Sequence, residues 1–389
     1  MEHYDIIVVG TGFCGATVAN LMARSGKRVL MLERRMHVAG NMYDEAVEGI
    51  LVQRYGPHTF HTNNDKVFQF VSQFGEWEPY YLRCQAVMNG KATPSPFNFK
   101  TIDDFYSPEE ATRLKERIAQ VYPGESQKTI LELLESPDEL IRGYAQFLFK
   151  NDYEPYTCKQ WGISPAELDI SVLRRVPVLF SYQERYFSDK YQMMPKHGFT
   201  KLFRLMLDHE NITIKLGTDA LKFFSVRPDG IYLSGERTTV PIVYTGAIDE
   251  LFQFCYGELP YRSLRFEYKT LPIRDYQDAP IVAYPQEKGY TRITEYTKLP
   301  VQEGLARTFI AVEYPLQYDP KQGHEPYYPV PCDSSHKTYQ QYLERAKRYA
   351  NLHLCGRLAD YRYYNMDQAI ARALFVTEQL LDGGRSNHD

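Results

Sequence analysis

Residues 5–15 read Asp5-Ile-Ile-Val-Val-Gly-Thr-Gly-Phe-Cys-Gly15 and carry the strongest structural signal in the sequence. Its apolar start predicts a strand that is buried on both faces of a parallel sheet. A helical stretch over 16–25 follows, and a second apolar run over 28–32 ends at Glu33. In this pattern glycines let the backbone approach a pyrophosphate and the acid accepts ribose hydroxyls, which predicts dinucleotide binding. The alternative is a Gly-rich turn that merely closes a βα unit. The predicted cofactor contacts are Gly10, Gly12, Phe13, Gly15 and Glu33.

The segments that complete this domain lie far along the chain. A basic, Gly-containing stretch from Arg34 to Asn41 directly follows the ribose-binding acid, which is typical of proteins that bind FAD in an extended form. Near the other end, 352–355 predicts a strand, and 367–381 predicts a helix whose first amides can face a flavin. The alternative is a terminal helix that only covers the sheet. The pattern favours FAD and adds Arg34, Asn41, Gly356 and Arg357 to the contacts.

Composition narrows the class of protein. The 389 residues are enough for two or three domains. The 45 basic and 49 acidic residues, with a net charge of −4, argue against a nucleic-acid binder, which normally carries a basic excess. No apolar run approaches the roughly 20 residues of a membrane helix. The first strand begins near Tyr4, which leaves no space for a signal peptide, so we expect a cytoplasmic protein.

The cysteines and histidines predict no metal site. The six cysteines include no CxxC pair and are expected to be reduced and mostly buried. The ten histidines include no HExxH motif, and His58 and His61 lie three residues apart with no evident third ligand. Tyrosine is unusually frequent, with 32 residues against 21 Phe. That bias suits a sugar or phosphate ligand, and it equally suits half-buried cores.

The middle of the chain is predicted to be inserted into the cofactor domain. Ser-Pro starts at Ser107, Ser136 and Ser164, each with Glu three residues on, predict three capped helices. Alternating β-branched and aromatic residues over 262–268, 280–284 and 308–314 predict an antiparallel sheet. The fold class is therefore α/β, with a discontinuous Rossmann-like domain, a small helical insert and an antiparallel sheet domain. The expected limits are 1–80, 200–250 and 335–389 for the FAD domain, 100–180 for the helical domain, and 81–99, 181–199 and 251–334 for the sheet domain.

Nine stretches resemble the flavoenzyme family of UDP-galactopyranose mutases and occur in the family's order, so the likeness runs from Asp5 to about Leu381. The first four are Arg54-Tyr-Gly-Pro-His-Thr-Phe-His-Thr62, Tyr156-Thr-Cys-Lys-Gln-Trp-Gly162, Arg175-Val-Pro-Val178 and Tyr186-Phe-Ser-Asp-Lys-Tyr-Gln192. The others are Tyr244-Thr-Gly-Ala-Ile-Asp249, Leu259-Pro-Tyr-Arg-Ser-Leu264, Tyr290-Thr-Arg-Ile-Thr-Glu295, Glu325-Pro-Tyr-Tyr-Pro-Val330 and Gly356-Arg-Leu-Ala-Asp-Tyr-Arg-Tyr-Tyr-Asn-Met-Asp367.

The resemblance implies an isomerase that interconverts UDP-galactopyranose and UDP-galactofuranose. In the family, N5 of reduced FAD attacks the anomeric carbon, UDP leaves, and the covalent adduct opens and recloses with no net redox change. An outside donor such as NAD(P)H must first reduce the flavin. The resemblance also implies a homodimer, no membrane partner and a role in cell-surface polysaccharide biosynthesis.

The resemblance assigns roles to residues that contact the sugar nucleotide or the flavin. The diphosphate needs cations, and the matching residues are Arg175, on a segment that is a mobile substrate loop in the family, and Arg292. Tyr156 matches the residue that stacks on uracil, Trp161 lines the sugar end, and His61 holds the flavin and sugar pocket together. The remaining matches are His58 and Met366 beside the flavin, Tyr186, Tyr328 and Tyr363 at the phosphates, and Asn365 near the substrate. Because these tyrosines occur in adjacent pairs, Tyr327 or Tyr364 is the alternative phosphate ligand.

Departures from the family pattern leave the sugar open. Ala39 replaces a usual glycine, which is tolerable if the position does not need a positive φ. Asn365 stands where many members carry aspartate, and Pro155 stands where glycine is usual; 93–99 also diverges. UDP-galactose is expected first, then its N-acetyl analogue or a deoxy-sugar nucleotide. Two other classes stay open: an amine-oxidase-like flavin oxidoreductase and a catalytically silent nucleotide-sugar binder.

Overall fold

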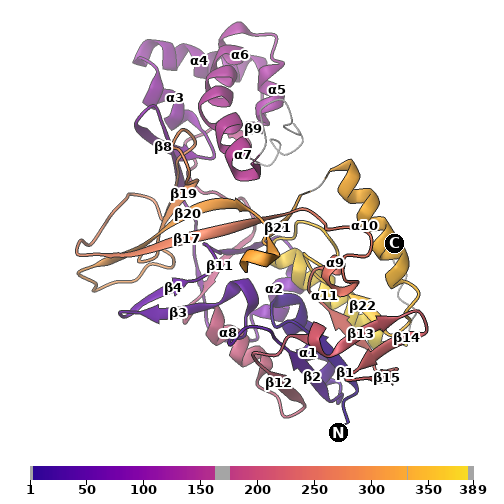
Figure 1. The fold of residues 1–389 in the computed structure, drawn as a ribbon. Coiled ribbons are helices and arrows are strands. Elements are labelled where there is room, and N and C mark those ends of the chain that lie inside the picture. The colour runs from indigo at the N-terminus through magenta and orange to yellow at the C-terminus, as the bar shows by residue number, and fades with distance from the viewer. Residues whose placement is uncertain (1–2, 163–175, 331, 384–389) are drawn as a thin grey trace.

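A five-stranded parallel sheet joins the two ends of the chain. The computed structural model describes residues 3–162, 176–330 and 332–383 (Figure 1). All neighbouring strands in this sheet are parallel, although they come from four distant parts of the sequence. In spatial order they are β12 (Ile212–Lys215), β2 (Val29–Leu32), β1 (Ile6–Val9), β16 (Ile242–Tyr244) and β22 (Leu352–Leu354). This is the discontinuous Rossmann-like arrangement predicted from the sequence.

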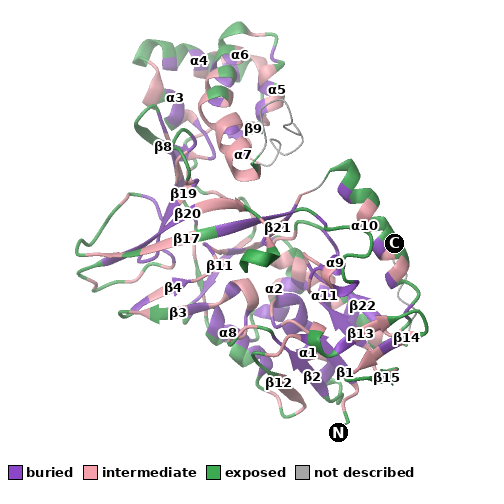
Figure 2. Cartoon of the chain, viewed as in Figure 1, coloured by how far each residue is buried: buried purple, intermediate pink, exposed green. Residues whose placement is uncertain are grey.

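Both faces of the parallel sheet are covered, which explains why its strands are apolar throughout. Ile6 and Val8 pack into a core with α1, α8 and α11, whereas Ile7 packs on the opposite face against α10 and the β13–β15 meander. Figure 2 shows the same sheet as the most continuously buried part of the molecule. The elements around it are α1 (Phe13–Arg24), α2 (Asp65–Val71), α8 (Phe199–Leu207), α9 (Ile248–Leu251), α10 (Asp333–Ala346), α11 (Met366–Leu381), β13 (Phe224–Arg227), β14 (Gly230–Leu233), β15 (Glu236–Thr238) and the 3₁₀ turns η1 (Gly40–Met42) and η5 (Ala220–Lys222).

A seven-stranded sheet forms the middle of the molecule (Figure 1). Its strands are, in order, β21 (Tyr328–Pro329), β17 (Tyr261–Leu271), β20 (Thr308–Gln317), β19 (Arg292–Glu295), β18 (Ile281–Ala283), β7 (Cys84–Met88) and β8 (Lys91–Ser95). The sequence predicted an antiparallel sheet, and one correction is needed, because β18 and β7 pair in parallel. The chain leaves β7–β8 for the helical region and returns only much later, so this junction is not a hairpin. The other small strands are β3 (Asp44–Val47), β4 (Ile50–Gln53), β5 (Phe60–Thr62), β6 (Trp77–Pro79), β9 (Gln127–Lys128), β10 (Val178–Leu179) and β11 (Tyr191–Pro195), and a 3₁₀ turn η6 (Pro320–Gln322) follows β20.

A helical lobe stands at the β7–β8 end of this sheet (Figure 1). Its helices are α3 (Phe99–Phe105), α4 (Pro108–Val121), α5 (Ile130–Leu134), α6 (Glu139–Leu148), the π-helix η2 (Phe149–Tyr153) and α7 (Glu154–Trp161). The predicted capping box at Ser107 is confirmed, since its hydroxyl accepts from the Glu110 N–H and the Glu110 carboxylate reaches back. The second predicted start is wrong by two residues, because Asp138 and not Ser136 caps α6. The third, at Ser164, lies outside the described residues.

The helix that leads into the cavity described below is not regular. Between α6 and α7 the five residues of η2 form a π-helical turn, and Pro155 follows at the start of α7. Proline has no N–H to donate and its ring crowds the preceding turn, so the ordinary α-helical ladder is interrupted there. Pro155, which departs from the family pattern, thus lies just after a π-helical turn. Such widened turns occur frequently at functional sites.

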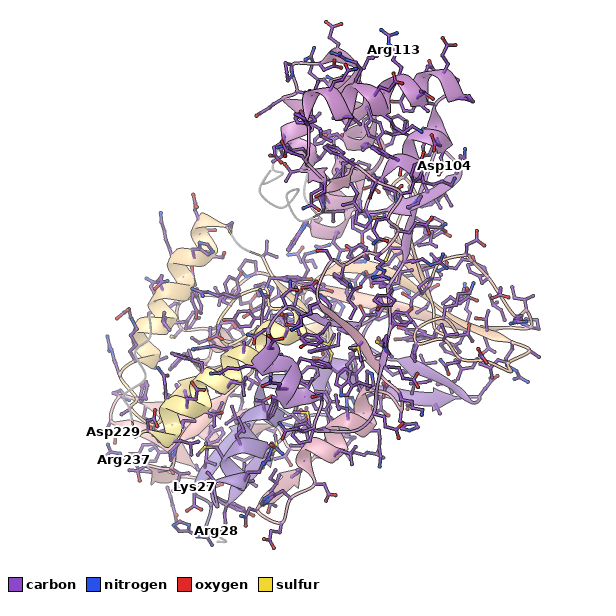
Figure 3. The ribbon with its side chains drawn as sticks, turned by 180° about the vertical axis from the view of Figure 1, so that it is seen from behind. Lys27, Arg28, Asp104, Arg113, Asp229 and Arg237 are labelled. Carbon is purple, nitrogen blue, oxygen red and sulfur yellow. The ribbon has the colours of Figure 1, made fainter. Side chains whose placement is uncertain are left out.

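Charged side chains of both signs occupy both ends of the molecule. In the view from behind, Asp104 and Arg113 lie in the helical lobe, and Lys27, Arg28, Asp229 and Arg237 lie at the opposite end (Figure 3). Neither labelled end therefore presents charges of a single sign. No helix in the described part of the chain is long and apolar enough to cross a membrane.

Candidate active site: a cofactor groove that opens into a substrate cavity

The Gly-rich turn forms the floor of a groove at the carboxyl edge of the parallel sheet. Gly10 has φ of 97°, and a Cβ built there would lie 2.1 Å from Thr245 Oγ1. At Gly15 a Cβ would lie 2.0 Å from the Gly10 carbonyl oxygen, so the helix can approach the strand this closely only with glycine. At Gly12, in contrast, no protein atom lies within 4 Å of the Cβ position. Helix α1 starts there without a side-chain cap, which leaves its first amides free for an anion.

Glu33 ends β2 beside this turn and is buried. Thr11 donates to Glu33 Oε2 through its backbone N–H (3.0 Å) and its hydroxyl (2.7 Å), and the Arg35 N–H donates to Oε1 (2.9 Å). Each carboxylate oxygen keeps acceptor capacity toward the groove. This chemistry fits a ribose diol, and together with the open face at Gly12 it fits a bound dinucleotide.

Two arginines follow Glu33 and share one carboxylate. Arg34 lies 2.7 Å from Glu325 and 3.7 Å from Glu250, while Arg35 lies 2.9 Å from Glu325 and donates to Asn41 Oδ1 at 3.0 Å. Arg34 and Asn41, both predicted from the sequence, therefore line the groove. Arg35 was not predicted, although it lies in the same basic stretch.

Ala39, next to this stretch, adopts the conformation that glycine favours. Its φ is 81°, and the residue is fully buried. Alanine was expected to be tolerable here only if the position does not need a positive φ, and that condition is not met. The position retains the backbone shape of the usual glycine at the cost of local strain.

The carboxyl-terminal segment closes the groove from the other side. Gly356 has φ of 118°, and a Cβ there would lie 3.2 Å from Cys14 Sγ. The next residue, Arg357, donates to the carbonyl of Tyr327 (3.2 Å) and to that of Tyr364, and its guanidinium lies over the rings of Tyr328 and Tyr363. The residues predicted to bind the cofactor from this end, Gly356, Arg357 and Met366, thus line the groove.

A second cavity, of about 620 Å³, lies between the seven-stranded sheet and the helical lobe, a size that suits a small organic ligand. The groove and this cavity share three lining residues, Arg357, Asn365 and Met366. A cofactor that extends along the groove therefore presents its far end to whatever occupies the cavity. The sequence-predicted residues that line the cavity are His58, His61, Tyr156, Trp161, Tyr186, Arg292, Tyr328, Arg357, Tyr363, Asn365 and Met366.

Cationic groups concentrate in this cavity. Arg292 is tied to the buried Glu313 carboxylate by Nε (2.8 Å) and Nη2 (2.7 Å), which leaves its other N–H donors for a ligand. Burial lowers the pKa of Arg292, but Glu313 together with the phenols of Tyr156 and Tyr328 raises that pKa above its ordinary value. Arg262 also lines the cavity; its Nε donates to the Gln160 carbonyl (3.0 Å), and no described carboxylate pairs with it. Arg262 was missed, although it lies within the quoted stretch 259–264.

The two histidines have different environments. The Nδ1 atom of His58 lies 2.8 Å from the Gly56 carbonyl oxygen. Burial, and then the charge of Arg357, lowers the pKa of His58 to about 3, so its ring is neutral at physiological pH. His61 stacks on Phe187 at 3.6 Å, and its Nδ1 lies 3.0 Å from Asp189 Oδ2. Asp189 therefore orients His61, a role that the sequence analysis did not assign.

The structure separates the two tyrosine pairs. Tyr328 and Tyr363 stack on each other at 5.4 Å and line the cavity, whereas Tyr327 and Tyr364 line the cofactor groove. Of the alternatives left open by the sequence, Tyr328 and Tyr363 are therefore the ones that line the second cavity.

Some predicted features lie elsewhere. Arg175 falls outside the described residues. Asn365 caps helix α11 by a box with Gln368, so it has a structural role in addition to lining both spaces. Within the described ranges no three His, Cys, Asp or Glu side chains gather as metal ligands would, and all six cysteines are free thiols.

Comparison with known proteins finds matches to residues that line the groove and to residues that line the cavity. A model of the UDP-galactopyranose mutase family matches residues 151–363, and one of NAD(P)-binding Rossmann-like domains matches 8–74. A UDP-galactopyranose mutase of Mycoplasma pneumoniae is 37% identical over 389 residues, covering 98% of this chain and 97% of the relative. A dTDP-fucopyranose mutase of Escherichia coli is 35% identical over 376 residues, covering 95% and 96%.

A solved structure of reduced UDP-galactopyranose mutase has the same fold, with a TM-score of 0.71 at 16% identity over 99% of this chain and 95% of that one. The regions matched by the two family models include the Gly-rich turn, most of the cavity lining and Arg357, which lines both spaces. The full-length relatives rule out a likeness confined to the Rossmann-like part. The chain is therefore an enzyme of the UDP-galactopyranose mutase family.

Proposed function

We propose that the chain interconverts UDP-galactopyranose and UDP-galactofuranose, with reduced FAD in the groove and no net redox change. The observation that carries this proposal is the junction of groove and cavity at Arg357, Asn365 and Met366. When bound, reduced FAD supplies a nucleophilic nitrogen, N5, for the anomeric carbon of the sugar. The groove would hold FAD by the amides at the start of α1, by Glu33 and by the basic stretch after it.

The arginines of the cavity would stabilise the departing UDP. The anomeric C–O bond breaks with its electron pair on UDP, so negative charge grows at the diphosphate. Arg292, held by Glu313, keeps free donors for that charge, and Arg262 is a second cation on the same wall. Arg175 is proposed as a further diphosphate ligand from the family motif alone. Charge-assisted hydrogen bonds of this kind are about twice as strong as neutral ones.

The other side chains would position the ligand. The stacked pair Tyr328 and Tyr363, with Tyr186, offers hydroxyls to the phosphates, and Tyr156 offers a ring face to the uracil. Trp161 lines the cavity at the end of α7 and is proposed at the sugar. His61, fixed between Asp189 and Phe187, would hold the wall beside flavin and sugar.

Further parts of the proposal rest on the family resemblance. We propose a homodimer that works in the cytoplasm, an external donor such as NAD(P)H that reduces the flavin, and a role in cell-surface polysaccharide biosynthesis. Neither nucleic acid nor a membrane is proposed as a partner.

A second candidate substrate is a related nucleotide sugar. The Escherichia coli relative named dTDP-fucopyranose mutase is almost as similar as the UDP-galactopyranose mutases, which favours a deoxy-sugar nucleotide as the alternative. UDP-N-acetylgalactosamine is a further alternative, and an amine-oxidase-like oxidoreductase is the least favoured, because a cavity lined by phosphate-binding cations does not serve it.

The test is turnover of UDP-galactofuranose with and without dithionite, followed by anion-exchange chromatography. We expect UDP-galactopyranose only under reducing conditions, with no net oxidation of the flavin. Conversion of dTDP-fucofuranose in its place would select the second candidate. Net consumption of NAD(P)H or O₂ in step with substrate would contradict an isomerase.

A further inference from the structure

The π-helical turn η2 places an acidic side chain in the wall of the cavity. Asp152 lines the cavity next to Tyr153 and Tyr156, and its side chain is half-buried. Among the described residues, none donates a hydrogen bond to the Asp152 carboxyl and none forms an ion pair with it. The rest of this helix face lines the cavity with apolar or neutral groups, namely Tyr153, Tyr156, Thr157, Gln160 and Trp161.

The surroundings of Asp152 disfavour its charge. Burial raises the pKa of Asp152 to about 7, and the charge of Lys159 only partly opposes this shift. Lys159 directs its ammonium group to the backbone carbonyls of Tyr284, Pro285 and Glu287, away from a pairing with Asp152. The phenols of Tyr153, Tyr156 and Tyr186 face this part of the wall and are neutral at pH 7. The charges of Arg292 and its partner Glu313 act on Tyr156, whereas Lys159 is the charged group that shifts the pKa of Asp152.

The proposed function, on which this step rests, determines in which order the sugar, the diphosphate and the base of a nucleotide sugar lie along the cavity. The sugar must lie where the groove enters, at Arg357, Asn365 and Met366. The diphosphate comes next, at the arginines. The base therefore lies at the remaining end, beside η2 and the start of α7. Asp152 is the one carboxyl among the described residues that line the cavity.

We propose that Asp152, as a neutral carboxylic acid, binds the imide edge of a uracil or thymine base, so that nucleotide binding depends on a proton held by this residue. The acid carbonyl accepts from the base N3–H, and the acid O–H donates to a flanking base carbonyl. The ionised form offers two acceptors and faces two carbonyl oxygens beside a single donor, so it repels the imide. A guanine edge, with two neighbouring donors, instead suits the ionised form.

Protonation of Asp152 makes the affinity for the nucleotide depend on pH. A ligand that binds only the acid form raises the pKa of Asp152 in the complex. Affinity for UDP and dTDP is then constant well below pH 7, and above pH 7 it falls by about tenfold per pH unit, the slope of one linked proton. Asp152→Asn keeps one donor and one acceptor at all pH values, so its affinity does not follow this slope.

The experiment measures the dissociation constants of UDP, dTDP and GDP from the flavin-loaded oxidised enzyme between pH 6 and pH 9, for the wild type and Asp152→Asn. We expect the wild-type constants for UDP and dTDP to rise above pH 7 relative to the variant, with no such rise for GDP. Ionisation of the nucleotide phosphates affects both proteins equally and cancels in the ratio. Parallel profiles in the two proteins would overturn the proposal.

A second measurement does not need the variant to fold. Calorimetric titration of the wild type with UDP at pH 8, in two buffers of different ionisation enthalpy, reports whether protons are taken up. Uptake is expected, and zero uptake or release would overturn the proposal. Because the readout is nucleotide binding, this result is independent of which sugar is turned over. Failure of UDP-galactofuranose turnover with intact proton uptake would refute the substrate proposal alone.

Discussion

The cofactor groove and the substrate cavity are neighbours, but they are built differently. The groove is formed largely by backbone: the turn at Gly10 and Gly15, the free amides of α1 and the turn at Gly356. The cavity is formed by side chains from the helical lobe, the seven-stranded sheet and the start of α11. A backbone site requires particular residues at fixed spacing, so it leaves a motif. A side-chain site requires only that distant segments meet, so it leaves no local pattern.

The largest effects are expected in the groove, where two glycines should behave oppositely. Gly15→Ala places a methyl group 2.0 Å from a backbone oxygen, so we expect the flavin-free protein to unfold at a lower temperature. Gly12→Ala meets no protein atom within 4 Å, so we expect unchanged stability of the flavin-free protein but loss of most bound flavin. Thermal unfolding and flavin absorbance of the purified proteins check both. Full flavin content in Gly12→Ala would contradict the role of this face.

The next largest effect is expected in the cavity, without loss of flavin. Arg292→Met is best combined with Glu313→Gln, because Glu313 is buried and must not keep an unpaired charge. We expect kcat/KM to fall by about 100-fold or more, the usual effect of removing a group that stabilises developing charge. Glu313→Gln alone serves as the control. Unchanged turnover in the double variant would remove Arg292 from the mechanism; the same loss is expected for Arg175→Ala.

The adjacent tyrosines Tyr327 and Tyr328 allow one hydroxyl to be removed from either region without changing the other. Tyr328→Phe removes the hydroxyl of a residue that lines the cavity. We expect KM for the sugar nucleotide to rise about tenfold, as for loss of one hydrogen bond to a charged group. Tyr327→Phe removes the hydroxyl of a residue that lines the groove, so we expect flavin affinity to change in this variant. Steady-state kinetics and flavin titration of both variants provide the comparison. Equal effects of the two changes on KM would mean that the regions are not separate.

A smaller effect concerns stability at low pH. The pKa of His58 is lowered from its ordinary value of 6.5 to about 3 in the folded protein, so only the unfolded chain binds this proton between these values. Stability is therefore lost as pH falls below about 6.5, by about 2 kcal/mol at pH 5 for this residue. In His58→Asn this part of the loss is expected to be absent. Urea unfolding at pH 7 and pH 5 tests it, and an equal loss in both proteins would refute it.

The smallest effect is expected at Ala39. Its φ of 81° is unfavourable for alanine, so Ala39→Gly relieves strain while the unfolded chain gains freedom. We expect the free energy of unfolding to rise by no more than about 1 kcal/mol, with turnover unchanged. Chemical denaturation of the two proteins measures the difference. A clear destabilisation would show that the alanine methyl group contributes packing that outweighs the strain.

Much of the fold follows from local pattern. The apolar run before Gly10 and the acid at Glu33 predicted the parallel sheet and the groove, and the Ser107 start predicted α4. The predicted helix start was wrong where two nearby residues can each cap the helix. At Ser136 the next residues include a second good cap, Asp138, whose carboxylate accepts from two backbone amides and places the helix start later. The parallel pairing of β18 with β7 has no local signal, because the two strands are almost two hundred residues apart.

The Rossmann-like unit and the family could be predicted from the sequence alone, because both depend on glycines at fixed spacing and on motifs in a fixed order along the chain. Three features become visible only in the folded chain: which tyrosine of each pair lines the cavity, the contact of Asp189 with His61, and the strain at Ala39. Folding also brings Arg262 and Asp152 into one cavity. The physical reason is that side-chain direction and burial depend on segments that meet only after folding, and these two properties set the charge and the pKa that the site chemistry uses.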